Sequence, residues 1–139
     1  MEHPPNYIEI KQSTIPNAGK GAFTKEKIKK GTLFEYKGVW LDHRAYKKKK
    51  NHKLYIWEVY DPDSSEVIGY VDSGNKKTSN WTRYVNCCRN KREENLKHQQ
   101  MGKKVFYRAK RTIYPGEELL IWYGDDYGVY LGITTYNKT

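Results

Sequence analysis

The chain has 139 residues, a length typical of one folded domain with its own core, and we expect residues 1–139 to form a single domain. Its net charge of +10 favours an acidic partner, such as nucleic acid or an anionic cofactor. The two cysteines, Cys87 and Cys88, are adjacent, which excludes a disulfide scaffold and a zinc site with four cysteine ligands. No apolar run reaches the roughly 18 residues of a membrane span, and no secretory signal is visible. We therefore expect an intracellular protein without membrane contact.

Short runs of β-branched and aromatic residues, separated by turn signals, predict a mainly β fold. The expected strands are Tyr7–Lys11, Thr32–Trp40, Leu54–Tyr60, Val67–Val71, Val105–Ala109 and Leu119–Trp122. Glycine, proline, asparagine and aspartate occur between them, as in PNAG, DPDSS and YPGEE. Helix is expected only around Asp42–Lys50 and Arg92–Gln100. Because the strands do not alternate with long helices, the pattern excludes a Rossmann-type fold.

Two segments carry residues suited to binding a ligand. Asn17–Thr24, NAGKGAFT, has glycines on both sides of Lys20, and a glycine loop lets the backbone approach a ligand closely. A plain turn between two strands is the alternative interpretation. Arg83–Asn90, RYVNCCRN, contains an asparagine whose amide both donates and accepts hydrogen bonds. Its two cysteines are either part of a site or small core residues, and no histidine lies in a motif that would activate them.

Taken in order, three groups of residues resemble the successive motifs of a SET domain. They are GKGAF at Gly19–Phe23, GYVDSGN with NWTRYVNCC within Gly69–Cys88, and FYRAKRTIYPGEELLIWYG at Phe106–Gly124. The resemblance covers nearly the whole chain and is closest to the PR/SET branch, the PRDM family, because Asn86-Cys87 stands where common SET domains carry Asn-His. Within this family the chain is similar to the meiotic, recombination-specifying type, which carries the domain ahead of zinc fingers. The resemblance implies a SET β-fold of several short sheets, with short helices and a C-terminal pseudoknot, and a fragment of a larger protein.

The function that the resemblance implies is S-adenosyl-L-methionine-dependent methylation of a histone lysine. The expected substrate is the histone H3 tail or the nucleosome, with the first lysine of the tail as target, in the nucleus and by a monomeric domain. The catalytic residues implied are Tyr123, which orients the methyl donor and the amine, and Tyr107 and Tyr36, whose hydroxyls line the lysine channel and limit the methyl groups that fit. Because such a channel lowers the pKa of the amine by desolvation, a histidine base is not required.

The binding residues that the resemblance implies fall into two groups. The cofactor-binding residues are Ala18, Gly19, Lys20, Tyr55, Asn86 and Cys87. The substrate-binding residues are Tyr55, Ile56, Trp57, Glu58 and Tyr123. The segment His52–Glu58 is expected to bind the histone peptide as an added β-strand. No metal site is expected.

Several features leave alternatives open. The chain lacks a cysteine-rich tail, so the peptide channel is closed either by Asp125–Ile133 or by sequence beyond residue 139. The run Lys47–Lys50 is either a non-specific DNA contact or a solvated charge run. An acidic rim would offset the repulsion between a basic domain and a basic tail, with Glu58, Asp61, Asp63, Glu66, Glu93, Glu94, Asp125 and Asp126 as candidates. The second hypothesis is a PR domain with weak methyl transfer that serves as a chromatin interaction module. A nucleic-acid-binding domain is the third.

Overall fold

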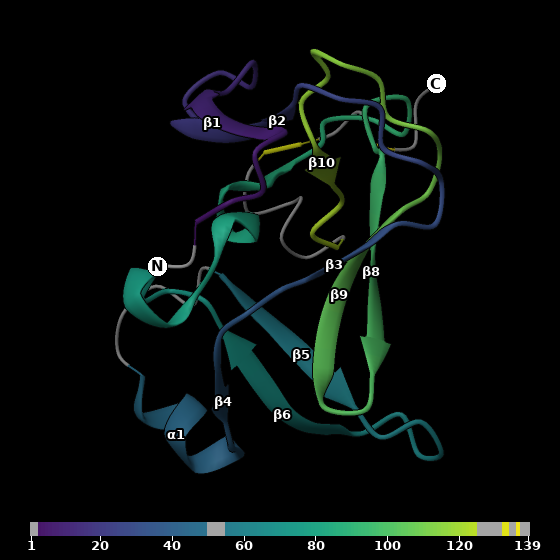
Figure 1. The fold of residues 1–139 in the computed structure, drawn as a ribbon. Coiled ribbons are helices and arrows are strands. Elements are labelled where there is room, and N and C mark those ends of the chain that lie inside the picture. Colours follow the sequence, from purple (N-terminus) through teal and green to yellow (C-terminus); the bar gives the residue numbers. More distant parts are fainter. Residues whose placement is uncertain (1–2, 50–54, 125–131, 134–135, 137–139) are drawn as a thin grey trace.

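The computed structural model describes residues 3–49, 55–124, 132–133 and 136, and it is mainly β, as predicted. In chain order the elements are β1 (Ile8–Gln12), β2 (Lys20–Thr24), β3 (Leu33–Glu35), β4 (Val39–Leu41), α1 (His43–Lys48), β5 (Ile56–Tyr60), β6 (Val67–Asp72), the 3₁₀ turns η1 (Lys76–Thr78) and η2 (Trp81–Tyr84), β7 (Asn86–Cys87), β8 (Leu96–Met101), β9 (Lys104–Ala109) and β10 (Leu120–Ile121). The strands form three sheets, in the orders β1–β2, β3–β9–β8–β10–β7 and β4–β6–β5 (Figure 1). No helix in these described ranges is long and apolar enough to cross a membrane.

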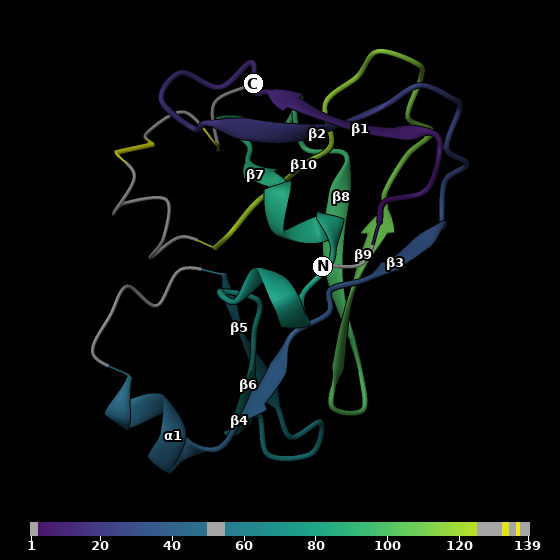
Figure 2. The same ribbon diagram turned by 60° about the vertical axis from the view of Figure 1, so that its left-hand side comes forward.

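The three sheets surround a common centre. Figure 2 shows the β1–β2 hairpin at one end of the molecule, the β4–β6–β5 sheet with α1 at the other, and the β8–β9 hairpin along one side. The side chain of Gln100 in β8 joins this hairpin to β5. Its Nε2 donates to the carbonyl oxygen of Tyr60 at 2.6 Å, and its Oε1 accepts from the amide of Tyr60 at 2.8 Å. The long hairpin is therefore fixed to the outer edge of the three-stranded sheet.

Alternation along β9 explains how the core forms. Val105, Tyr107 and Ala109 are buried, whereas Lys104, Phe106 and Arg108 are exposed or half-buried on the other face. This two-residue period is that of a strand with one face on a core. The other large side chains that are fully buried include Leu96, Ile113, Leu119 and Ile121. The core thus lies between the five-stranded sheet and the segments that pack against its inner face.

Strand β10 brings together two segments that are distant in the sequence. It pairs in parallel with β7, where Leu120 lies opposite Asn86 and Ile121 opposite Cys87, and Ile121 also pairs with Leu96 of β8. The side chain of Asn95 strengthens this junction, because its amide donates to the carbonyl oxygen of residue 118 and accepts from the amide of residue 120, both at 2.8 Å. The C-terminal motif therefore lies beside the YVNC segment, as the family resemblance implied.

The structure corrects three of the predicted elements. The helix predicted over Arg92–Gln100 is wrong, since Leu96–Met101 is strand β8, paired along its length with β9. The single strand predicted over Thr32–Trp40 is two strands in different sheets, β3 and β4. Gly38 lies between them, where a Cβ atom would clash with the backbone of Asp72. The glycine segment Asn17–Thr24 is a loop only at its start, because Lys20–Thr24 forms β2.

The helix predicted around Asp42–Lys50 is confirmed as α1. The Asp42 side chain caps it by accepting a hydrogen bond from the amide of Ala45 at 2.7 Å. Lys47 and Lys48 lie in its last turn, where positive charge is favourable. Lys49 forms an ion pair with Asp72 at 2.8 Å and so is not a purely solvated charge, while Lys50 lies outside the described residues.

Candidate functional site

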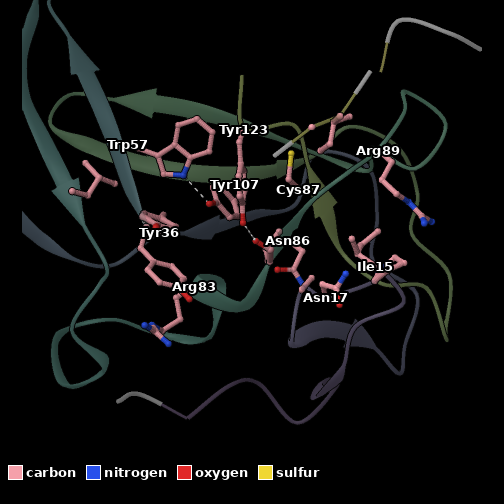
Figure 3. A pocket seen from close by; sticks show the side chains of 17 residues that line it. Ile15, Asn17, Tyr36, Trp57, Arg83, Asn86, Cys87, Arg89, Tyr107 and Tyr123 are labelled. Atoms are coloured by element: carbon pink, nitrogen blue, oxygen red, sulfur yellow. Dashed lines mark hydrogen bonds between the residues drawn. The ribbon is translucent and has the colours of Figure 1, made fainter. Parts of the chain in front are cut away.

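A cavity of about 700 Å³ lies where β5, β7, β9 and the loop before β2 meet. Its wall is formed by Ile15, Pro16, Asn17, Ala18, Tyr36, Tyr55, Ile56, Trp57, Arg83, Val85, Asn86, Cys87, Arg89, Tyr107, Tyr123, Gly132 and Ile133. Cavities of this size hold small organic ligands or cofactors. Trp57 and the tyrosines gather in one part of the wall with Arg83 beside them, and Asn17, Asn86 and Arg89 lie in the other part (Figure 3).

Three tyrosines meet in the centre of the cavity. Tyr36 follows β3, Tyr107 lies in β9 and Tyr123 follows β10, and Figure 3 shows their side chains gathered together. The rings of Tyr36 and Tyr107 lie 5.1 Å apart between centroids, and the two residues are 3% and 1% exposed. Burial raises the pKa of both hydroxyls, which therefore stay neutral and able to donate and accept hydrogen bonds at physiological pH.

Trp57 of β5 holds the aromatic part of the wall together. Its indole Nε1 donates to the hydroxyl oxygen of Tyr107 at 2.7 Å, and its ring stacks on His98 of β8 at 4.5 Å between centroids. The indole also packs edge-on against Tyr123, 6.2 Å away. Since the indole occupies one acceptor position of the Tyr107 hydroxyl, it also restricts where that hydroxyl can direct its own proton.

The hydroxyl of Tyr123 is positioned by the backbone of the YVNC segment. It donates to the carbonyl oxygen of Val85 at 2.5 Å. Val85 is buried and directly precedes β7, which pairs with β10. The parallel pairing and this hydrogen bond therefore fix the ring of Tyr123 from both ends.

Two arginines bring positive charge to the cavity wall. Arg83 is 7% exposed and donates to the carbonyl oxygens of Ser73 and Gly74 at 3.1 and 3.3 Å, and its guanidinium lies 4.4 Å from the ring centre of Tyr55. Arg89 forms an ion pair with Glu93 at 2.5 Å, and this hydrogen bond lowers the pKa of the Glu93 carboxyl. These partners hold both guanidinium groups in place beside the cavity.

Most residues predicted for the site are brought together. Ala18, Tyr36, Tyr55, Ile56, Trp57, Asn86, Cys87, Tyr107 and Tyr123 all line the cavity. Gly19, Lys20 and Glu58 do not. Gly19 has a φ of +71° in the turn before β2, Lys20 is exposed at the start of that strand, and Glu58 is exposed on β5. The predicted peptide segment His52–Glu58 is described only from residue 55 onward.

The sequence interpretation missed both arginines and the loop residues Ile15 and Pro16. Arg83 and Arg89 flank the YVNC motif, but in a chain with 26 basic residues an arginine carries no visible sign that it faces a cavity. Ile15 and Pro16 precede the predicted segment Asn17–Thr24, and their side chains have no polar group that would mark them as ligand contacts. Their role becomes visible only when β1 and β2 fold the loop over the cavity.

The two thiols are poorly suited to nucleophilic catalysis. Burial raises the pKa of Cys87 to about 11 and that of Cys88 to about 12, so both remain protonated at neutral pH. Within the residues that the structure describes, no three His, Cys, Asp or Glu side chains gather as they would around a metal ion.

The predicted acidic rim is only partly present. Glu58, Asp63 and Glu66 are exposed on and around the β5–β6 turn, and Asp61 is half-buried. The prediction is wrong for Glu94, because this residue is 3% exposed and its carboxylate forms an ion pair with Lys110 at 3.1 Å. Glu93 is engaged by Arg89, and the last two candidates, Asp125 and Asp126, lie outside the described residues.

The small sheets, the parallel pairing of β7 with β10 and the tyrosine-lined cavity define a SET-type fold. The model of the PR domain of PR domain zinc finger protein 2 matches residues 8–134, and the chain therefore belongs to the PR domain family. The methyltransferase domain of human PR domain-containing protein 2 has the same fold, with a TM-score of 0.70 and 29% identity over 88% of this chain and 80% of that one.

Curated relatives agree with this family. Histone-lysine N-methyltransferase PRDM7 of Homo sapiens is 38% identical over 132 residues, which are 93% of this chain and 25% of the relative. Histone-lysine N-methyltransferase set-17 of Caenorhabditis elegans is 36% identical over 89% of this chain and 43% of the relative. The chain thus spans less than half the length of these curated relatives.

Proposed function

We propose that this chain is a histone-lysine N-methyltransferase domain that uses S-adenosylmethionine and acts on the first lysine of the histone H3 tail. The observation that carries the proposal is the meeting of Tyr36, Tyr107 and Tyr123 in one cavity whose wall also carries amide and guanidinium groups. Two relatives that cover most of the chain are named histone-lysine N-methyltransferases, which supports the reaction class. The family match over residues 8–134 supports a single PR/SET domain.

The polar part of the cavity fits a methyl donor with an amino-acid end and an adenine ring. When bound, S-adenosylmethionine supplies a methyl group on a positively charged sulfonium. Backbone groups of Ile15–Ala18 and the amide of Asn86 offer hydrogen bonds to the donor's polar groups. Arg89, on the side of the cavity where Asn17 and Asn86 lie (Figure 3), supplies positive charge for its carboxylate. Tyr55, beside Arg83, adds an aromatic surface to the wall.

The aromatic part of the cavity fits a lysine side chain. A lysine with a pKa near 10.4 must lose its proton before it attacks, which costs about 4–5 kcal/mol at pH 7. A channel of buried tyrosines reduces this cost, because removing water from around an ammonium group favours its neutral form. The hydroxyls of Tyr107 and Tyr123 then orient the amine for in-line attack. No base with a pKa near neutrality is needed for this step.

Strand β5 is the proposed docking edge for the histone peptide. It is the outer strand of the β4–β6–β5 sheet, and Tyr55, Ile56 and Trp57 reach the cavity from its first residues. A peptide that adds to this edge receives backbone hydrogen bonds and directs a side chain toward the tyrosines.

We further propose that a monomeric domain works on nucleosomes in the nucleus, where the exposed Lys47 and Lys48 contact DNA phosphate.

The test is methyl transfer to nucleosomes and to H3 peptide, with the modified residue mapped by mass spectrometry. A peptide in which arginine replaces the first lysine is the matched control, and it should accept few methyl groups. Equal modification of both peptides would refute the target but not the reaction class. Calorimetry then measures whether the methyl donor binds to the domain. Donor binding without transfer would favour the chromatin interaction module, and no binding would reject the methyltransferase function.

A further inference from the structure

The carboxylate of Glu118 is the most heavily hydrogen-bonded side chain beside the proposed cofactor loop. Glu118 is 7% exposed and lies two residues before β10. Its Oε2 accepts from the hydroxyl of Ser13 at 2.6 Å, and its Oε1 accepts from the amide and the hydroxyl of Thr14 at 2.9 and 2.6 Å. The amide nitrogen of Asn86 lies 3.5 Å from Oε2. One carboxylate thus connects β1, β7 and the approach to β10.

These contacts determine the shape of the loop Ser13–Gly19. The hydroxyl of Ser13, while donating to Glu118, accepts from the amide of Ile15 at 3.0 Å. The amide of Ser13 donates to the carbonyl oxygen of Gly19 at 2.8 Å, and the amide of Ala18 donates to that of Ile15 at 3.2 Å. The residues between these bonds, Ile15–Ala18, line the cavity. The carboxylate therefore holds the loop at its N-terminal base.

The second glycine of the GKG motif belongs to the same arrangement. A Cβ atom on Gly21 would clash with Oε2 of Glu118. Gly21 is buried in β2, and its φ is not in the left-handed region. This glycine is therefore required to make room for the carboxylate, and not to let the backbone approach a ligand. Asn86 completes the arrangement by donating to the carbonyl oxygen of Lys20 at 2.9 Å.

We infer that Glu118 is a positioning residue, which acts through Ser13 and Thr14 to hold the cofactor loop in its binding conformation. The inference rests on the proposed function, because the loop is assigned to the methyl donor there. A bound ligand gains affinity from a loop that is already ordered, since it does not have to supply the free energy of ordering. Loss of the carboxylate should therefore weaken donor binding while leaving the peptide edge at β5 unchanged.

Glu118→Gln is the informative substitution, because glutamine keeps the size but replaces one acceptor oxygen with an NH₂ donor. With its oxygen toward Thr14, the new NH₂ group faces the hydroxyl of Ser13 and the amide nitrogen of Asn86, which is itself a donor. Glu117→Gln is the matched control. Glu117 is the adjacent carboxylate and is also hydrogen-bonded, to Arg111 at 3.1 Å and to the amide of Tyr114 at 2.6 Å, but it does not line the cavity or contact the loop.

The experiment measures three quantities in both variants: the Kd for S-adenosylhomocysteine by calorimetry, the KM for H3 peptide, and hydrogen–deuterium exchange over residues 13–19. Removing a charge-assisted hydrogen bond predicts that Glu118→Gln raises this Kd by about tenfold or more, with the peptide KM unchanged. It also predicts faster hydrogen–deuterium exchange over residues 13–19. Glu117→Gln should change neither the Kd for S-adenosylhomocysteine nor this exchange. Thr14→Val removes one donor from the other side and should weaken binding in the same direction by a smaller factor, so it serves if Glu118→Gln does not fold.

Wild-type affinity and loop exchange in Glu118→Gln would overturn the inference, as would equal effects in the two glutamate variants. Failure of the unaltered protein to bind S-adenosylhomocysteine would instead refute the proposed function. In that case the exchange measurement still decides whether Glu118 orders the loop. The two hypotheses therefore fail separately.

Discussion

The hydrogen bond between Trp57 and Tyr107 can be measured by a double-mutant cycle. Tyr107→Phe removes the hydroxyl and leaves the indole N–H without its acceptor, which lies at 2.7 Å. Trp57→Phe leaves the hydroxyl of Tyr107, a residue only 1% exposed, without its donor. Stranding a buried polar group costs about 1–3 kcal/mol, and loss of an aromatic contact such as that with His98 adds about 0.5–1.5 kcal/mol. We expect Tyr107→Phe to destabilise by about 1–2 kcal/mol and Trp57→Phe by about 2–4 kcal/mol.

In the double variant both partners are absent, so neither is stranded. Its loss of stability should therefore be smaller than the sum of the two single losses by about 1–2 kcal/mol. The free energy of unfolding is measured with urea, using far-UV circular dichroism because the substitution of Trp57 changes the fluorescence. Additive losses, within about 0.5 kcal/mol, would show that the indole and the hydroxyl do not depend on each other and would refute this account of the channel wall.

Four further predictions concern the same cavity. Tyr123→Phe removes the hydroxyl that donates to the carbonyl oxygen of Val85. It should lower turnover severely, reduce the free energy of unfolding by only about 1 kcal/mol and leave donor affinity unchanged. Unchanged turnover would contradict the proposed role. Folding raises the pKa of Cys87 from 9 to about 11, so its thiol should react with a disulfide reagent at pH 8 on the order of 100-fold more slowly in the native protein than in urea. The same shift contributes stability that is complete below pH 9 and is lost as the pH rises toward 11, so the urea midpoint should fall over that interval. Activity should rise from pH 7 toward about 9 without a step near 6.5, because no histidine is among the residues found to line the cavity; a plateau that begins near pH 7 would indicate a dedicated base.

Local patterns in the sequence predicted the fold class, whereas the resemblance to SET domains predicted most of the cavity residues. Val105, Phe106 and Tyr107 form a short β-branched and aromatic run, and that run identifies β9 without any tertiary information. The same reasoning failed for β8, where Lys97, His98, Gln99 and Gln100 are polar and only Leu96 is fully buried. Such a strand has no β-branched or aromatic run to detect, and it is its pairing with β9, and with β10 at Leu96, that makes it a strand.

The polar contacts of the site were harder to predict than its tyrosines. A tyrosine motif near the chain's end is a local signal, whereas the contacts of Glu118 with Ser13 and Thr14 join residues more than 100 positions apart. Nothing in the sequence around GEEL distinguishes Glu118, which is buried, from Glu117, which supports an exposed turn. That difference arises only when β2 pairs with the segment before β10.

The hydrogen bonds of Gln100 have a consequence for the register of a bound peptide. A strand that joins an exposed sheet edge needs the free N–H and C=O groups of that edge, and unprotected edges also recruit unwanted chains. At Tyr60 both groups are already used by the Gln100 side chain. In the proposed docking an added strand would end before Tyr60, and only the first part of β5 would serve as a template. Gln100 of the β8–β9 hairpin would thus act as a stop that keeps the incoming chain beside Tyr55 and Trp57, which line the cavity.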